Sequence, residues 1–406
     1  MTDFTPRIPT GLSAALDRRR LLRGLTVGGL GLAFAGQAPL QALARSSGER
    51  AKFVAIIARG AMDGLSVTAP HDDPAYVALR GGLALPPPTE TGGTLALTQG
   101  FGLHPALKGL HQAYGEGRMR FAPAVAIPTR VRSHFDAQDM LESGGERLHQ
   151  SDTGWLNRAL AAAGGRGLSI GAQTPLILRG PAESSSWAPG GRIGGDERLA
   201  ALLQDLYVED QLLATSLARG LETEALAESG LMAGAGPRRG DVAALAGSVA
   251  RLMTGETGAD VVALSIDGWD THARQAGQLQ ARLTQLDLLI SGLKQGLGEE
   301  WARTIVMVAT EFGRTARVNG TQGTDHGTAS TLLLTGGAVK QGGPIGDWPG
   351  LSDAALFEDR DLAPTLDIRG VFKGVLRDHL GVDRAALDRA VFPDSAAEAP
   401  AVSGLV

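Results

Sequence analysis

Carboxylates and imidazoles are gathered in a few short segments of this 406-residue sequence. His134, His272 and His326 each have an aspartate within two residues along the chain. The chain contains no cysteine, so disulfides, thiolate zinc sites and cysteine nucleophiles are excluded. Oxygen and imidazole donors without thiolate suit Zn, Mn, Mg or Ca. The combination predicts a site for a divalent metal ion.

Three arginines and a serine add a second kind of chemistry to the same segments. Arg130 and Arg132 precede Ser133, and Arg314 lies in a later segment. Guanidinium groups bind oxyanions such as phosphate or sulfate. Ser133 is predicted to stand at the start of a helix, where the helix N-terminus favours an oxyanion and could activate the hydroxyl. The alternative is that Ser133 only caps this helix, with Asp136 completing a capping-box-like pattern.

Each of these signals has a plain structural explanation when taken alone. An Asp-Gly pair such as the one that begins at Asp63 is typical of a turn. Asp267 and Asp270 could cap the helix that follows them, and Arg314 could be a surface cation. It is their combination that favours a site, because all of these segments follow predicted strands.

Short, continuous apolar runs predict the strands of a buried parallel sheet. The runs are Phe53–Ala58, Met119–Ala126, Pro175–Leu178, Asp260–Ile266, Thr304–Ala309 and Ser330–Leu334. Helical periodicity predicts helices over Arg198–Leu217, Asp241–Met253, His272–Leu297 and Asp361–His379, with an exposed loop over 230–240. The alternation indicates an α/β sandwich with a mainly parallel sheet. The active site of such a sheet lies beyond the carboxyl ends of its strands, where the segments above are located.

The first 44 residues have the pattern of an export signal. Consecutive arginines at 18–20 precede an apolar, charge-free run over 24–43, and the segment ends in the small-residue pattern Ala42-Leu43-Ala44. Paired arginines before a Gly-rich core resemble twin-arginine (Tat) signals, which implies the Tat export machinery as a partner. A single membrane anchor is the alternative. We expect a periplasmic or secreted protein with no stable membrane span after cleavage, because no second run is long and apolar enough.

The remaining chain is predicted to form one domain over 50–383, followed by a flexible tail over 394–406. The formal net charge of -5 argues against a broad nucleic-acid surface.

Five motifs occur in one order and carry a resemblance to a known family. They are Arg59–Leu65 (RGAMDGL), Arg132–Gln138 (RSHFDAQ), Asp267–His272 (DGWDTH), Glu311–Thr315 (EFGRT) and Thr324–Gly327 (TDHG). The series resembles the bacterial Tat-exported proteins grouped as domain of unknown function 1501, over residues 50–383. That family in turn resembles the alkaline phosphatase/sulfatase superfamily. This second resemblance implies a three-layer α/β/α sandwich, alkaline phosphatase-like, with a two-metal site on strand-end loops.

The resemblance also implies roles for several residues. The implied metal ligands are Asp63, Asp267 or Asp270 with His272, Glu311 and His326, and Asp325 is a further candidate. Phe312 stands where the superfamily would have a second histidine, which leaves one metal short of a ligand unless Asp325 or His134 substitutes. The cysteine- or serine-containing signature of sulfatases is absent, so the resemblance supports the fold more strongly than the chemistry.

The expected function is that of an exported metal-dependent hydrolase of phosphate or sulfate esters, with one or two divalent cations and a small anionic ester as substrate. Ser133 is the expected nucleophile, His134 a proton shuttle or ligand, and Arg314 a clamp on the anion. One alternative is a non-catalytic binding or scaffold protein of the cell envelope on the same fold. Another is a structural envelope protein whose Asp–His pairs are only buried networks.

Overall fold

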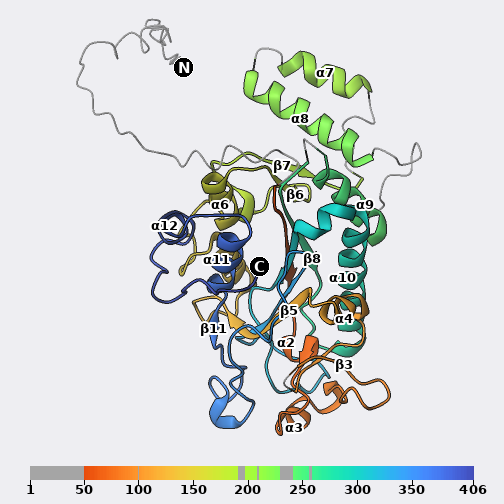
Figure 1. The fold of residues 1–406 in the computed structure, drawn as a ribbon, viewed down its shortest axis with the longest axis vertical. Coiled ribbons are helices and arrows are strands. Elements are labelled where there is room, and N and C mark those ends of the chain that lie inside the picture. Colours follow the sequence, from red (N-terminus) through yellow and green to blue (C-terminus); the bar gives the residue numbers. More distant parts are fainter. Residues whose placement is uncertain (1–49, 99, 191–196, 208–209, 229–240, 256–257) are drawn as a thin grey trace, which may run out of the picture. The chain divides into compact units, whose positions relative to one another are not determined.

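An eight-stranded sheet is the central layer of the computed structural model (Figure 1). The structure describes residues 50–98, 100–190, 197–207, 210–228, 241–255 and 258–406. The predicted export signal and the predicted loop over 230–240 lie outside the described residues. The strands are β1 (Lys52–Arg59), β5 (Met119–Ala126), β6 (Gly167–Ile170), β7 (Ser184–Trp187), β8 (Val261–Asp267), β9 (Thr304–Ala309), β10 (Ser330–Thr335) and β11 (Leu366–Asp367).

The order of the strands is β11-β5-β10-β9-β1-β8-β6-β7. β10 runs antiparallel to both of its neighbours, β5 and β9, and every other pairing in the sheet is parallel. The prediction of an α/β fold with a mainly parallel sheet is therefore confirmed. A small antiparallel sheet of β2 (Thr68–Ala69), β4 (Gly102–Leu103) and β3 (Leu95–Ala96) is separate from it.

Helices cover both faces of the large sheet and make the structure three-layered (Figure 1). Because successive strand residues point to opposite faces, Phe53 and Ile57 of β1 join one apolar cluster while Val54 and Ala58 join another. The first cluster includes α5 (His134–Ser143), α6 (Trp155–Ala163) and α11 (Ile368–Asp378). The second includes α4 (Lys108–Gly115), α9 (Val242–Met253) and α10 (Gln275–Leu297).

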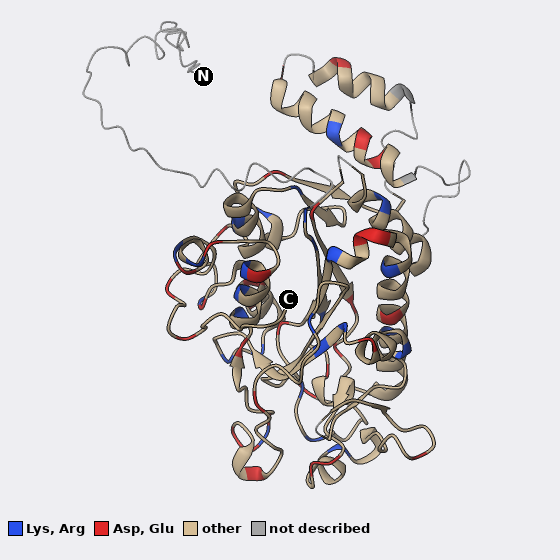
Figure 2. Cartoon of the chain, viewed as in Figure 1, with Lys and Arg blue, Asp and Glu red and all other residues tan. Residues whose placement is uncertain are grey.

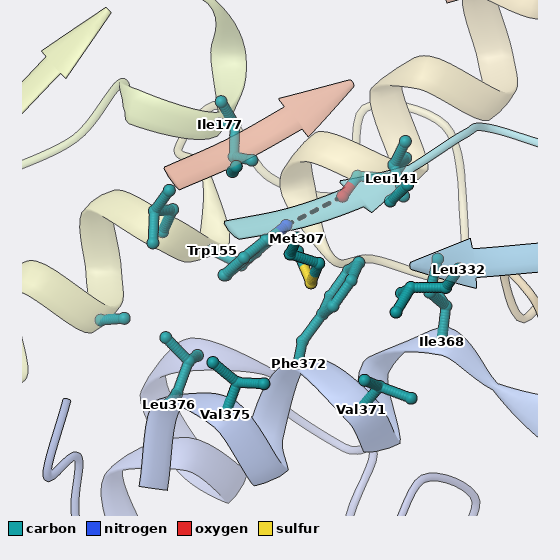
Figure 3. Packing of buried hydrophobic residues seen from close by; sticks show 14 of the residues in the cluster. Leu141, Trp155, Ile177, Met307, Leu332, Ile368, Val371, Phe372, Val375 and Leu376 are labelled. Atoms are coloured by element: carbon teal, nitrogen blue, oxygen red, sulfur yellow. Dashed lines mark hydrogen bonds between the residues drawn. The ribbon is translucent and has the colours of Figure 1, made fainter. Parts of the chain in front are cut away.

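Aromatic packing anchors the first of these layers (Figure 3). Trp155 and Phe372 stack with ring centroids 4.6 Å apart, which joins α6 to α11. The Trp155 indole N–H donates to the carbonyl of Leu141 at 3.0 Å, so its one polar group is satisfied inside the core. This packing fixes α5, whose first residue contributes to the site described below.

The remaining α-helices of the described residues are α2 (Gly64–Val67), α3 (Tyr76–Arg80), α7 (Glu197–Tyr207), α8 (Gln211–Glu228) and α12 (Arg384–Ala386). None of the helices in the described part of the chain is both long enough and apolar enough to cross a membrane.

Several local predictions were wrong. Residues Leu176–Leu178 form a 3-10 helix after Pro175 instead of a strand. The short, Ser- and Gly-containing strands β6 and β7, which have little apolar character, were missed. The helix predicted over Arg198–Leu217 is two helices, α7 and α8. The last predicted helix begins only at Ile368, where the Asp367 side chain accepts from the Arg369 N–H and caps it.

The C-terminal segment is packed against the domain, so the prediction of a flexible tail is also wrong. Ala399 and Leu405 are buried. The Val402 N–H donates to the carbonyl of Gly370 at 3.0 Å, and Leu405 accepts from the Lys340 N–H. The apolar residues of this segment find a surface on α11 that composition alone did not reveal.

Candidate metal centre

The loops that leave one edge of the sheet bring the predicted site segments together. β1, β5, β8 and β9 are parallel in direction, so their carboxyl ends meet at this edge. β10 runs the other way, which brings the residues that precede it to the same edge. Acidic and basic residues both occur along the loops of the chain (Figure 2).

Four donor groups converge there: the imidazoles of His134, His272 and His326, and the carboxylate of Asp270. The Nε2 atom of His326 lies 3.1 Å from the Nε2 atoms of both other histidines. Asp270 Oδ1 lies 3.1 Å from His326 Nε2 and 2.8 Å from His272 Nε2. Asp270 Oδ2 lies 3.5 Å from His134 Nε2. We call these four residues the metal centre, as the candidate site for a divalent cation.

The neighbours of the metal centre fix the orientation of each ring. The Nδ1 atom of His134 faces Glu311 Oε1 at 2.9 Å, and that of His326 faces the Arg132 carbonyl at 2.8 Å. The Nδ1 atom of His272 faces Asp325 Oδ1 at 3.1 Å. Since all three partners only accept, each neutral ring carries its proton on Nδ1 and leaves a lone pair on Nε2.

This donor arrangement fits a divalent cation. Lone pairs on three Nε2 atoms and a carboxylate face one another, which is repulsive unless a positive charge lies between them. A tetrahedral zinc with metal–nitrogen distances of about 2.0 Å requires ligand atoms about 3.3 Å apart, close to the separations of 3.1–3.5 Å among His134, Asp270 and His326. Histidines whose Nδ1–H is held by a carboxylate or carbonyl are typical of metal ligands. Among the described residues, His134, Asp270 and His326 are the group whose ligand atoms converge tightly enough to hold an ion, and His272 adjoins it.

Glu311 lies behind His134, not among the donors that converge. It is fully buried, and its Oε1 accepts hydrogen bonds from His134, from Gln138 at 2.9 Å and from the Gly60 N–H at 2.8 Å. Burial opposes ionisation, but these hydrogen bonds outweigh it and hold the pKa of Glu311 below its usual range. In return, the hydrogen bond to Glu311 raises the pKa of His134. The carboxylate therefore orients the His134 ring and lies behind the converging donors.

Asp325 plays the same part for His272. It is half exposed, and the hydrogen bond from His272 lowers its pKa. The Asn319 side chain also donates to Asp325 Oδ1, at 3.2 Å. Of the two residues considered as substitutes for the histidine missing at Phe312, His134 is the one whose imidazole converges with the other donors, and it stacks on the Phe312 ring at 4.9 Å between centroids.

Arg314 is not the accessible anion clamp that the sequence suggested. It is buried, and one guanidinium nitrogen donates to Asp270 Oδ1 at 2.5 Å while the others bond to Thr324. Burial opposes ionisation of Asp270, but the hydrogen bond from Arg314 and the nearby histidines outweigh it and lower the pKa of Asp270. Arg314 therefore keeps a donor of the metal centre ionised and in place.

Two predicted ligands lie apart from the metal centre. Asp63 is buried and receives hydrogen bonds from Ser66, Arg80 and Gln275, so its charge is compensated inside the fold. Asp267, the last residue of β8, is exposed, and its side chain has no hydrogen bond or ion pair with any other residue that the structure describes.

Ser133 immediately precedes the donor His134 at the start of α5. Its side chain is exposed and makes no capping hydrogen bond, so the capping-box alternative does not hold. The neighbouring arginines are occupied: Arg132 forms an ion pair with Asp361 at 2.7 Å, and Arg130 donates to the carbonyl of Ile127 at 2.7 Å. The role of Ser133 as a nucleophile stays a prediction.

Close backbone approaches hold these loops together, and the sequence pattern did not reveal them. Gly60 has a φ of +111°, and a Cβ there would lie 2.6 Å from the Asp270 backbone nitrogen. Gln138, also missed, is four residues after His134 and hence on the same face of α5. That helical spacing is the signal that could have identified it.

Comparison with known proteins places the chain in a family. Residues 111–391 match the model described as protein of unknown function (DUF1501), and the chain belongs to that family. No curated protein matches the sequence.

Solved structures give remote similarities. A protein in the alkaline phosphatase superfamily from Vibrio parahaemolyticus is 12% identical, with a TM-score of 0.36 over 74% of this chain and 63% of that one. The chain thus spans less than two thirds of that protein. BT1596, a 2-O GAG sulfatase, is 13% identical, with a TM-score of 0.38 over 87% and 73%. The C-terminal periplasmic domain of EcEptC from Escherichia coli, in complex with Zn, is 8% identical, with a TM-score of 0.36 over 71% and 74%.

Proposed function

We propose that this protein is an exported, metal-dependent hydrolase of phosphate or sulfate esters. The observation that carries the proposal is the metal centre, in which three imidazole lone pairs and a carboxylate converge at the carboxyl edge of the sheet. Asp270 and His272 are both more than a third exposed, so a ligand from solvent can reach the donors. A catalytic metal site needs such an open side.

In this proposal, His134, Asp270, His272 and His326 hold one divalent cation, and a second cation would need further donors. When bound, the cation neutralises ester oxygens and lowers the pKa of a nearby hydroxyl or water. Glu311 and Asp325 keep the protons of two rings on Nδ1, away from the donor atoms. The exposed Ser133 hydroxyl is the proposed nucleophile, because it adjoins His134 and has no hydrogen-bond partner among the described residues.

Export to the periplasm or beyond is part of the proposal and rests on the sequence pattern of residues 1–44. The Tat machinery carries folded proteins, so the metal would be loaded before export. A small anionic ester from that compartment is the proposed substrate.

The decisive experiment combines metal analysis with hydrolysis of aryl phosphate and aryl sulfate. Purified protein is expected to carry metal, to lose hydrolysis in chelator and to regain it when Zn or Mn is added back. Ser133→Ala should abolish hydrolysis and retain the metal, whereas Ser151→Ala, on another loop, should change neither. Hydrolysis that is unaffected by both the chelator and Ser133→Ala would rule the proposal out.

A second candidate is a non-catalytic metal-binding or scaffold protein on the same fold. The specific observation in its favour is Phe312, an apolar ring packed against His134 where the superfamily would have another donor. Metal retention without turnover on any ester of a broad panel is the result expected from this candidate.

A further inference from the structure

Gln275, the first residue of α10, is fully buried and joins two of the segments that carry donors of the metal centre. Its Oε1 accepts from the Thr271 hydroxyl at 3.0 Å and from the Thr324 hydroxyl at 2.6 Å. Thr271 directly follows the donor Asp270. Thr324 stands two residues before the donor His326. A single amide oxygen therefore ties together two segments that are far apart in the sequence.

The direction of each hydrogen bond around Gln275 is set by the Asp63 carboxylate. Asp63 pairs with Arg80 and only accepts hydrogen bonds, so the Gln275 amide nitrogen must face it and donate. The amide oxygen is then turned to Thr324, whose hydroxyl donates to it and keeps a lone pair for the Arg314 Nε–H at 3.2 Å. A reversed amide would bring its oxygen against the Asp63 carboxylate, which is repulsive.

The network ends on a donor of the metal centre. The Thr324 hydroxyl and carbonyl both accept from Arg314, and another guanidinium nitrogen of Arg314 donates to Asp270 Oδ1 at 2.5 Å. The Thr324 N–H donates to the Thr271 carbonyl at 3.3 Å, so the backbones of the two segments are joined as well. Because Thr271, Gln275, Arg314 and Thr324 are all buried, the loss of one partner leaves a polar group that water cannot readily satisfy.

We propose that Gln275 is a positioning residue of the metal centre, which holds the Asp270 segment and the His326 segment at the separation that one divalent cation requires. It acts through Thr271 and Thr324. Partners of this kind influence metal affinity because they limit the movement of the donor atoms. The inference rests on the proposed function for the presence of a metal, but it does not require ester hydrolysis.

The test measures the zinc Kd of the full chain by competition with a chromophoric chelator. Gln275→Leu, which removes both the acceptor and the donor, is expected to raise the Kd roughly tenfold or more. Thr324→Val keeps the shape of the side chain and removes only its hydroxyl, and it should raise the Kd in the same direction. Thr324→Ser retains the hydroxyl and should keep the Kd of the wild type.

Thr331→Val is the matched control. Thr331 is also buried, and its hydroxyl donates to the Ala122 carbonyl at 3.1 Å within the sheet, outside the network. Both Thr→Val variants should be less stable, with a lower Tm in chelator, because each loses a buried hydrogen bond. Only Thr324→Val should also bind zinc more weakly, a change that a merely structural role would not produce.

A zinc Kd that is unchanged in Thr324→Val, or raised equally in Thr331→Val, would overturn the inference, and so would a wild type that binds no divalent metal. If Gln275→Leu does not fold, the two Thr324 variants decide the question alone. Hydrolysis of aryl phosphate and aryl sulfate by the same samples separates this inference from the proposed function. Zinc binding that depends on Thr324, without turnover, supports the inference and removes the hydrolase. Turnover with a zinc Kd that is indifferent to Thr324 keeps the hydrolase and removes the inference.

Discussion

His134 and His326 face each other through their Nε2 atoms at 3.1 Å, while Glu311 and the Arg132 carbonyl hold their Nδ1 atoms from behind. Two neutral imidazoles in this arrangement present lone pairs to each other. The arrangement is stable only with a proton or a cation between the rings, and the Asp270 carboxylate beside them stabilises either positive charge. The predictions on metal content and affinity follow from this relationship.

Substitution of the central histidine should remove the metal. His326→Ala deletes the donor that lies 3.1 Å from three others, so metal content measured by mass spectrometry should fall from stoichiometric to background. Adding metal at about 100 times its Kd should stabilise the wild type by about 2.7 kcal/mol, seen as a higher Tm, and should leave the variant unaffected. His149→Ala, which removes an exposed histidine, is the control. Equal metal content in wild type and His326→Ala would contradict the assignment.

Removal of the negative charge of Glu311, which lies behind His134, should weaken metal binding without deleting a donor atom. Glu311→Gln keeps an oxygen that can accept from His134 and the Gly60 N–H but is neutral. The metal Kd, measured by competition with a chelator, should rise roughly 10–100-fold. Glu358→Gln, which neutralises an exposed partner of Arg132, should leave the Kd unchanged. A Kd for Glu311→Gln within twofold of the wild type would show that Glu311 only fills space.

The convergence of Asp270, His272 and His326 could be predicted from the sequence, because short motifs follow or precede apolar strands and a parallel sheet gathers such ends. Their role as metal ligands stays a prediction. The sequence could not distinguish donors from the residues behind them. Glu311 and Asp325 carry carboxylates, as metal ligands do. Only their positions, at the Nδ1 atoms of His134 and His272, show that they hold the rings from behind.

The predictions for Asp63 and Arg314 failed because of contacts that form only in the tertiary structure. Asp63 was expected to bind metal, but Arg80 lies 17 positions further along the chain and reaches it only through the fold. Arg314 was expected to face solvent, but Asp270 and Thr324 enclose its guanidinium. No periodicity or residue spacing in the sequence predicts such tertiary ion pairs and hydrogen bonds. In the fold, the strongly apolar strands were predicted and the short, polar β6 and β7 were not, because burial by neighbours can replace intrinsic apolar character.

The close approach of the loops at Gly313 should make that position intolerant of any side chain. A Cβ there would lie 1.7 Å from the Ala329 carbonyl oxygen, which belongs to the backbone and cannot move away cheaply. Gly313→Ala should lower the free energy of unfolding by roughly 1–3 kcal/mol, measured by urea denaturation. Gly277→Ala is the matched control, because Gly277 lies within α10 and a Cβ there meets nothing within 4 Å. The control should gain about 0.5–1 kcal/mol, and a loss as large as that of Gly313→Ala would refute the packing argument.

Acid should destabilise the fold through His104, which is buried away from the metal centre residues. Burial lowers the pKa of His104 to about 4, and its Nδ1 accepts from the Ala106 N–H at 3.1 Å, an interaction that requires the neutral ring. The unfolded chain takes up this proton near pH 6.5 and the folded chain only near pH 4. The free energy of unfolding therefore falls between these values as pH decreases, by about 3 kcal/mol from this residue.

His104→Asn should remove that part of the pH dependence, because the Asn side-chain oxygen can accept from Ala106 and does not titrate. Urea denaturation at pH 7 and pH 5 checks the prediction. The loss of stability between the two pH values should be smaller in His104→Asn than in the wild type. His111→Asn, at a less buried histidine that contacts the Ala96 carbonyl, should retain the wild-type loss. If the loss between pH 7 and pH 5 is the same in His104→Asn and the wild type, the buried neutral state assigned to His104 is wrong.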